Sequence, residues 1–161
     1  MFLFQVLFNG CKNPFSPALD NSLNNPSSTL SDQSTISGVF QNFQYAYAFR
    51  DTTIYGQLIT PDFVFTYHDY DNGYDVSWGR DEEMKTSYGL FQNSQTLNLI
   101  WNNIDLNSQD SSTANIIREF NLTITFSPTD VVTLSGRVNM SLRKNAKNKW
   151  QITNWVDESN F

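Results

Sequence analysis

Few side chains in this protein are of the types that usually perform acid–base chemistry. His68 is the single histidine among 161 residues, and Cys11 is the single cysteine. A general base near neutral pH would most naturally be His68, because an unperturbed imidazole titrates there. The adjacent Asp69 cannot easily orient the ring, since neighbours on a strand point to opposite faces. Tyr67 is predicted to point inward, so we expect His68 on the outer, solvated face.

The acidic segment after the histidine resembles a calcium-binding loop only in composition. Asp69, Asp71 and Asp75 surround the turn dipeptide Asn72-Gly73. The spacing does not fit the EF-hand pattern, and no glutamate stands at the twelfth position. One histidine and one cysteine also offer no zinc-ligand set. We therefore predict an exposed polar loop over residues 69–75, and neither a metal ion nor a cofactor.

Two polar residues interrupt strand faces that are otherwise apolar. Arg118 and Asn154 both fall on faces predicted to point inward, where an unpaired charge or amide is costly. Arg118 either lines a polar pocket or extends to its rim with the stem packed on the core. The candidate ligand-binding residues are Tyr47, Tyr67, Trp101, Arg118 and Asn154. An aromatic cavity with one arginine would suit a small ligand carrying a carboxylate or carbonyl. The alternative is that all five are core or rim residues of a filled domain.

The helices that would position these residues follow from apolar spacing. Apolar residues recur at intervals of three and four over residues 36–47, which predicts a long helix capped by Ser34 or Thr35. Asp51 caps a second, short helix that ends at Pro61, because the residue before a proline avoids helical geometry. A third helix is predicted over residues 79–91. Its inner side should carry Met84, Tyr88 and Phe91, and its first turn carries Asp81, Glu82 and Glu83, which complement the helix dipole.

Most of the remaining chain alternates with a period of two. This pattern predicts an antiparallel meander with one covered face. Matching inward residues places Phe120 opposite Val138 and Leu142 opposite Trp150. In the last strand Trp155 should lie on the outer face. An exposed tryptophan there is a candidate interface, unless the C-terminal tail covers it.

The bulk composition excludes several classes of protein. The chain fits one domain, and 15% aromatic with only 16% charged residues favours β-structure. A formal net charge of −6 argues against nucleic-acid binding. No apolar run approaches the roughly 18 residues that a membrane span needs.

The first eleven residues resemble a bacterial lipoprotein signal. Residues 1–8 are apolar except Gln5, and they are followed by Asn9-Gly10-Cys11. The resemblance implies a lipid on Cys11 and a location at the bacterial cell envelope, on its periplasmic or surface side. Phe8 stands where that family has leucine or a similar aliphatic residue, and no lysine or arginine precedes the cysteine; a start codon further upstream would explain both departures. The alternative is an ordinary apolar N-terminus with a buried cysteine.

Residues 12–33 contain prolines, asparagines and serines without periodicity, which predicts a flexible tether. The membrane would then be contacted only through the lipid.

The order of elements resembles the NTF2-like superfamily, and in particular its SnoaL-like members. Four stretches carry this resemblance: 40–51, 58–65, 78–82 and 150–155. It covers residues 35–157, and it implies an α+β cone over residues 34–161. In such a cone a curved antiparallel sheet wraps around a long N-terminal helix and two shorter helices, often encloses a pocket, and often dimerises through the sheet.

The same resemblance argues against one familiar activity. Ketosteroid isomerase-like members use an aspartate base and a tyrosine donor, whose positions fall near Tyr67 and Phe43 in this chain. Neither chemical group is present. We therefore favour an envelope lipoprotein whose domain binds a small ligand or a protein partner without catalysis. The alternatives are a diverged isomerase-, dehydratase- or cyclase-type enzyme, and a structural module that forms a homodimer.

Overall fold

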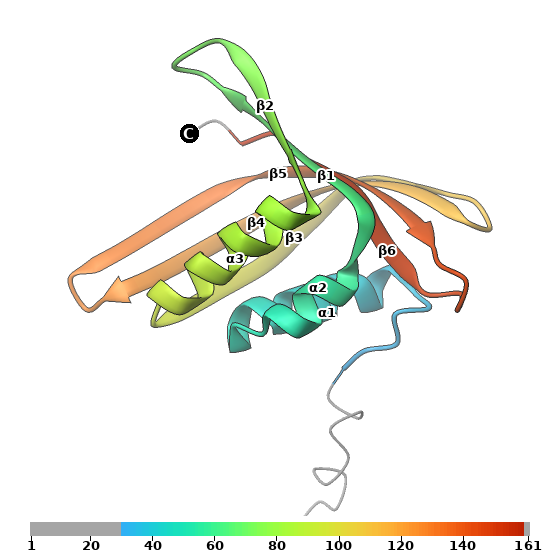
Figure 1. Ribbon diagram of the computed structural model, residues 1–161, viewed down its shortest axis with the longest axis horizontal. Coiled ribbons are helices and arrows are strands. Elements are labelled where there is room, and N and C mark those ends of the chain that lie inside the picture. The colour runs from blue at the N-terminus through green and yellow to red at the C-terminus, as the bar shows by residue number, and fades with distance from the viewer. Residues whose placement is uncertain (1–29, 160–161) are drawn as a thin grey trace, which may run out of the picture.

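The computed structural model describes residues 30–159, in which three helices lie against one side of a curved six-stranded sheet (Figure 1). The elements are α1 (Ile36–Phe49), α2 (Thr52–Leu58), β1 (Ile59–Asp69), β2 (Tyr74–Gly79), α3 (Arg80–Asn93), β3 (Thr96–Gln109), β4 (Thr113–Ser127), β5 (Asp130–Lys144) and β6 (Trp150–Asp157). The strand order is β2-β1-β6-β5-β4-β3, and only the β1–β6 pair is parallel. The expected α+β architecture, with a curved sheet around a long N-terminal helix and two further helices, is confirmed.

Both predicted helix caps form. Thr35 Oγ1 accepts a hydrogen bond from Gly38 N at 3.0 Å and so caps α1. Asp51 Oδ1 accepts from the backbone N–H groups of Thr53 and Ile54, both at 2.9 Å, and caps α2. These side chains satisfy backbone donors that the first turn of a helix leaves unpaired. The second helix ends at Leu58, earlier than the predicted end at Pro61, because the chain enters β1 at Ile59.

The segment predicted as a loop over residues 69–75 is largely a β-hairpin. β2 starts at Tyr74 and pairs antiparallel with β1, so that His68 stands opposite Asp75. The turn itself is short, and Gly73 takes the left-handed region with φ of 72°. The strand was missed because its exposed residues lack a clear hydrophobic alternation.

The predicted strand pairing is wrong by two residues in the β4–β5 hairpin. Phe120 stands opposite Gly136, and Val138 stands opposite Arg118. The register shifts beside the turn, where Phe126 has no partner in the ladder. A slip of two keeps every side chain on its predicted face, so the inward pattern survives the error.

A bulge in β6 changes more than register. Leu142 pairs with Ile152 instead of Trp150, whereas Ser141 pairs with Asn154, which leaves Thr153 as an extra residue in the ladder. Beyond the bulge the alternation of faces is inverted. Asn154, predicted inward, is therefore exposed, and Trp155, predicted outward, turns toward the helices.

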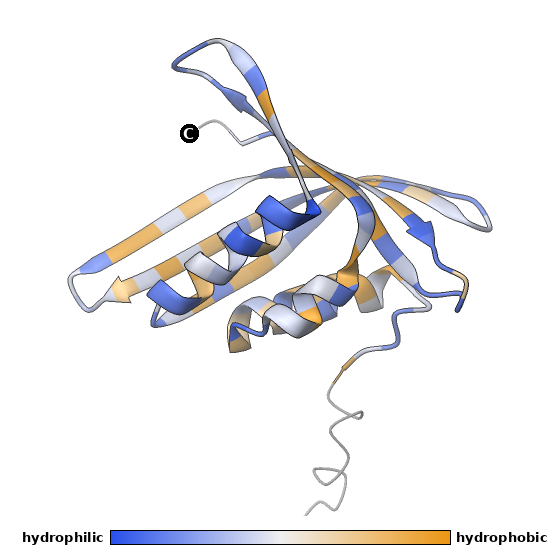
Figure 2. Cartoon of the chain, in the orientation of Figure 1, coloured by the Kyte–Doolittle hydropathy of each residue, from blue (hydrophilic) through white to orange (hydrophobic). Residues whose placement is uncertain are grey.

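One part of the domain is a filled apolar core. Ile116, Met140, Leu142 and Ile152 are at most 2% exposed, and they pack on the concave face together with residues of α1 and α2. The strands alternate between hydrophobic and hydrophilic residues, as Figure 2 shows. The apolar face of the meander thus covers the first helix, as the sequence pattern predicts.

The folded domain begins a few residues earlier than predicted. Gln33 and Trp150 exchange hydrogen bonds, because Trp150 N donates to Gln33 O at 2.9 Å and Gln33 Nε2 donates to Trp150 O at 2.8 Å. Asn42 and Ser31 are linked in the same way. Residues 31–33, which the sequence analysis places in the tether, therefore belong to the folded domain. Cys11, the signal over residues 1–11 and most of the tether lie outside the described residues. Within residues 30–159 there is no helix long and apolar enough to span a membrane.

Candidate functional site

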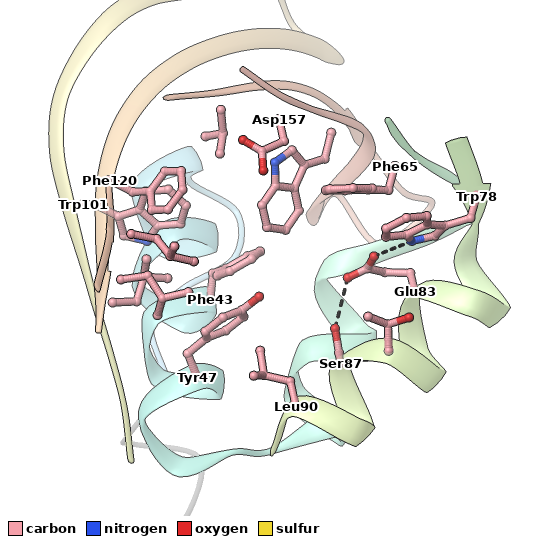
Figure 3. A pocket seen from close by; sticks show the side chains of 16 residues that line it. Phe43, Tyr47, Phe65, Trp78, Glu83, Ser87, Leu90, Trp101, Phe120 and Asp157 are labelled. Carbon is pink, nitrogen blue, oxygen red and sulfur yellow. Dashed lines mark hydrogen bonds between the residues drawn. The ribbon is translucent and has the colours of Figure 1, made fainter. Parts of the chain in front are cut away.

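A cavity of about 250 Å³ lies between the helices and the concave face of the sheet (Figure 3). It is lined by Phe43, Tyr47, Phe65, Trp78, Glu83, Thr86, Ser87, Leu90, Leu99, Trp101, Phe120, Leu122, Leu134, Val138, Trp155 and Asp157. Seven of the sixteen are aromatic. The polar groups around it are few, so each one restricts what the cavity accepts.

The aromatic wall is assembled from α1 and five strands of the sheet. Phe43 and Tyr47 lie one turn apart on α1 with stacked rings, 5.0 Å between centroids. Trp101 on β3 donates its indole N–H to Phe40 O at 3.0 Å, which ties the strand to the helix. Trp155 on β6 meets Phe43 edge-on at 5.5 Å. Such edge-to-face contacts orient rings as well as burying them.

Glu83 is a buried carboxylate in the wall, with only 5% of the residue exposed. Its Oε1 accepts hydrogen bonds from Tyr55 Oη at 2.5 Å and Ser87 Oγ at 3.0 Å, and its Oε2 accepts from Trp78 Nε1 at 2.8 Å (Figure 3). The carboxylate therefore fixes the ring of Trp78 and joins α2 to α3. With three donors already aimed at it, Glu83 is a positioning group.

The inner face of α3 thus differs from the predicted one. Tyr88, predicted inward, is 56% exposed, whereas Glu83, Ser87 and Phe91 are buried. These three residues are spaced four apart, which was the available signal for this face. It was missed because two of the three are polar, and hydrophobic periodicity counts them as outer positions.

Asp157 is a second carboxylate at the cavity, and the end of the chain holds it in place. Its Oδ1 accepts from Ser159 N at 3.0 Å and from Ser159 Oγ at 2.6 Å. Ser159 lies directly on Gly136, where an added Cβ would come within 1.8 Å of Ser159 Oγ. Oδ2 of Asp157 accepts no hydrogen bond from the described residues, so it is available to a ligand.

Tyr47 presents a hydroxyl to the cavity. The residue is 6% exposed, its hydroxyl points into the cavity, and nothing in the described part of the chain hydrogen-bonds to it (Figure 3). Burial, followed by the negative charges of Glu83 and Asp157, raises the pKa of Tyr47 well above its usual range. Tyr47 therefore keeps its proton and offers a hydrogen-bond donor.

The structure does not bring the five predicted ligand-binding residues together. Tyr47 and Trp101 line the cavity, whereas Tyr67, Arg118 and Asn154 do not. Tyr67 lies further along β1, its ring centroid 5.6 Å from that of Trp78. Asn154 is exposed for the reason given above.

Arg118 takes the rim position. Its guanidinium lies 4.9 Å from the ring centroid of Phe40 and 5.8 Å from that of Trp101, and its Nε donates to Asn102 O at 3.1 Å. Partial burial lowers the pKa of the guanidinium. Its role is a cation–π contact that braces β3 and β4 against α1.

Trp155 differs from its sequence assignment, whereas His68 agrees with it. Trp155 was predicted on the outer face as an interface, but it lines the cavity, and its indole N–H is buried without a partner in the described residues. His68 is exposed on the outer face as predicted, and its Nδ1 lies 2.7 Å from Asp75 Oδ1. That partner comes from the unpredicted strand β2. Among residues 30–159, no three His, Cys, Asp or Glu side chains are grouped to hold a metal ion.

Comparison with known proteins places the architecture. No protein-family model matches the sequence, and no curated protein matches it. An NTF2-like superfamily protein from Salmonella enterica superposes with a TM-score of 0.65 at 14% identity, covering 84% of this chain and 94% of its own. The chain has an NTF2-like fold. At this level of identity the likeness extends to the fold alone.

Two further neighbours of the NTF2-like domain carry provisional enzyme names. A protein from Streptomyces avermitilis, provisionally named a dehydratase from the NTF2-like family, has a TM-score of 0.64 at 16% identity, with 81% of this chain and 97% of that chain covered. Another, from Novosphingobium aromaticivorans and provisionally named a scytalone dehydratase, has a TM-score of 0.67 at 15% identity, with 78% and 82% covered.

Proposed function

We propose that the NTF2-like domain binds a small, largely apolar organic molecule in its cavity. The observation that carries this proposal is the Tyr47 hydroxyl, which belongs to a residue only 6% exposed, has no hydrogen-bond partner among the described residues and opens onto an aromatic space. The wall also holds a fully buried donor without an acceptor in the described residues, the indole N–H of Trp155, and such a donor costs about 1–3 kcal/mol. A ligand oxygen in the cavity would supply an acceptor to the Tyr47 hydroxyl.

The charges at the cavity restrict the ligand further. The sequence analysis expected Arg118 to attract a carboxylate, but Arg118 lies outside the lining, and Glu83 and Asp157 lie within it. A ligand carboxylate would therefore meet two like charges in a poorly hydrated site. The proposed ligand carries no negative charge.

Calorimetric titration with acetophenone, a neutral aromatic ketone, tests binding. The carbonyl should accept from Tyr47, so Tyr47→Phe should weaken binding by about tenfold. Tyr88→Phe is the matched control, because it removes an equivalent hydroxyl from an exposed residue of α3 that does not line the cavity. Equal affinities for the two variants would show that the Tyr47 hydroxyl does not contact the ligand.

Catalysis is the second candidate function. Tyr47 can donate to a carbonyl while the free Oδ2 of Asp157 takes a proton from the neighbouring carbon of a β-hydroxy ketone. The protonated Asp157 can then return that proton to the β-hydroxyl as its C–O bond breaks, which releases water and leaves the unsaturated ketone. The dehydratase names of two structural neighbours point the same way. If β-hydroxy ketones bind and lose no water, the domain only binds. If they react, Asp157→Asn should abolish turnover and retain binding.

We also propose that a lipid on Cys11 holds the domain at the bacterial cell envelope. The support is the sequence pattern of residues 1–11 and the proline-containing segment that follows. Expression of the full-length chain with a labelled fatty acid should label the wild type and leave Cys11→Ser unlabelled. A homodimer through the sheet stays a prediction, without Trp155 as its contact residue.

A further inference from the structure

The cavity has an unbalanced charge. Two of its lining residues, Glu83 and Asp157, are carboxylates, and no lysine, arginine or histidine among residues 30–159 lines it. The hydrogen-bond donors to these carboxylates are neutral groups, namely hydroxyls, an indole N–H and a backbone N–H.

Nearby cations are occupied elsewhere. Arg80 opens the same helix as Glu83, but its guanidinium donates to Ile59 O at 2.6 Å and Gly56 O at 2.8 Å. In the described part of the chain, neither Glu83 nor Asp157 takes part in an ion pair. Buried carboxylates are usually paired, because loss of hydration is otherwise uncompensated.

The walls of the cavity suit a positive charge. Seven of its sixteen lining residues are aromatic, and three of these seven are tryptophans: Trp78, Trp101 and Trp155. The faces of such rings carry negative potential and attract cations, with tryptophan the strongest. The domain already uses this contact outside the cavity, where Arg118 lies over Phe40.

We propose that the ligand of this cavity is a small organic cation of the quaternary ammonium type that also carries an oxygen. Three features of the cavity recognise this ligand. The aromatic rings surround the ammonium, the two carboxylates supply the counter-charge, and Tyr47 donates to the oxygen. This inference rests on the proposed binding function and specifies its ligand class.

A quaternary centre fits better than an ammonium with N–H groups. Both oxygens of Glu83 already accept hydrogen bonds, so Oδ2 of Asp157 is the one carboxylate oxygen of the cavity without a donor among the described residues. An ammonium with three N–H groups needs three acceptors around one nitrogen, and each donor left unmatched is costly in a buried site. A quaternary ammonium has none, and it loses little hydration on entering.

The test compares two ligands of equal shape. Choline is titrated against its neutral carbon isostere, in which a tert-butyl group replaces the trimethylammonium group, and acetophenone serves as the neutral aromatic probe. Choline should bind at least about tenfold more tightly than the isostere. Asp157→Asn keeps the acceptor that holds Ser159 and removes the charge, so it should weaken choline by about three- to tenfold and leave the isostere unchanged.

Asp130→Asn is the matched control, because it makes the same change of net charge at an exposed turn residue outside the cavity. It should leave choline affinity unchanged. If the isostere or acetophenone binds and choline does not bind more tightly than the isostere, the cation proposal is overturned while the binding function stands. If none of the three binds, both proposals are overturned.

Discussion

The two ends of the β4–β5–β6 sheet are built from similar residues, yet one end is filled and the other is hollow. At the filled end Ile116, Met140 and Ile152 are fully buried and pack without space for a ligand. At the hollow end Phe120 and Leu134 face the same side of the sheet and line the cavity. The comparison shows that the hydrophobic pattern decides which face is covered in β4 and β5, whereas a single bulge decides which residues of β6 line the hollow end.

Deleting Thr153 tests that comparison most severely. Without the bulge residue, Trp155 would turn outward and Asn154 inward, so the cavity would lose an aromatic wall and gain an unmatched amide. We expect a loss of at least about 4 kcal/mol in the free energy of unfolding, measured by urea denaturation. Thr153→Ala keeps the bulge and should cost far less. Similar losses for the two variants would show that the bulge does not set the facing of β6.

Shortening one side chain at each end of the sheet should show that the filled end loses more stability than the hollow end. Ile152→Ala at the filled end should cost about 2–5 kcal/mol, because the surrounding core cannot collapse fully. Leu134→Ala at the hollow end should cost about 1 kcal/mol, since its side chain already borders empty space. Denaturant midpoints with unchanged slopes would measure the difference. Equal losses would mean that the cavity is packed in solution.

Glu83→Gln probes the polar support of the hollow end. The amide can accept at one oxygen only, so the hydroxyl of Tyr55 or the indole N–H of Trp78 loses an acceptor. A loss of about 1–3 kcal/mol is expected in thermal or urea unfolding. Glu82→Gln, on the exposed side of the same turn, should stay within about 0.5 kcal/mol of the wild type. An unchanged free energy of unfolding for Glu83→Gln would show that Glu83 does not position its neighbours.

The smallest expected effect is on the pH dependence of stability, at Asp110 in the β3–β4 turn beyond the filled end. Hydrogen bonds from the backbone N–H groups of Ser112 and Thr113 lower the pKa of Asp110 to about 2. A depressed pKa in the folded state adds stability above the unfolded value of 3.8, which is lost as pH falls from about 4 to about 2. The small stability advantage of the wild type over Asp110→Asn should therefore shrink between pH 5 and pH 2.5. Choline or acetophenone binding to Asp110→Asn should be unchanged at neutral pH.

The sequence was sufficient for the parts of the fold that obey local rules. The caps at Thr35 and Asp51 depend on side chains beside the first turn, and the α1 stripe and strand faces depend on regular periods. These predictions hold because neighbouring residues alone decide them. The location of Tyr47 and Trp101 at the covered face follows from the same patterns.

The rest of the site depends on contacts between distant segments. Glu83 is buried because Tyr55 and Trp78 supply hydrogen-bond donors from other elements, and no local sequence pattern predicts these contacts. Trp155 is inside because β6 accommodates one extra residue between two partner strands. Arg118 was correctly placed on the inward face, but only the position of Phe40 decides that it lies at the rim.

Gly136 does not line the cavity, yet it affects the cavity through Ser159, which packs against it. A methyl group there would push Ser159 from its seat, and Ser159 is what orients the carboxylate of Asp157. Gly136→Ala should therefore lower choline affinity, because the added methyl group displaces Ser159 and also crowds Phe120 in the cavity wall at 3.1 Å. Ser159 thus couples β5 to the carboxylate at the cavity.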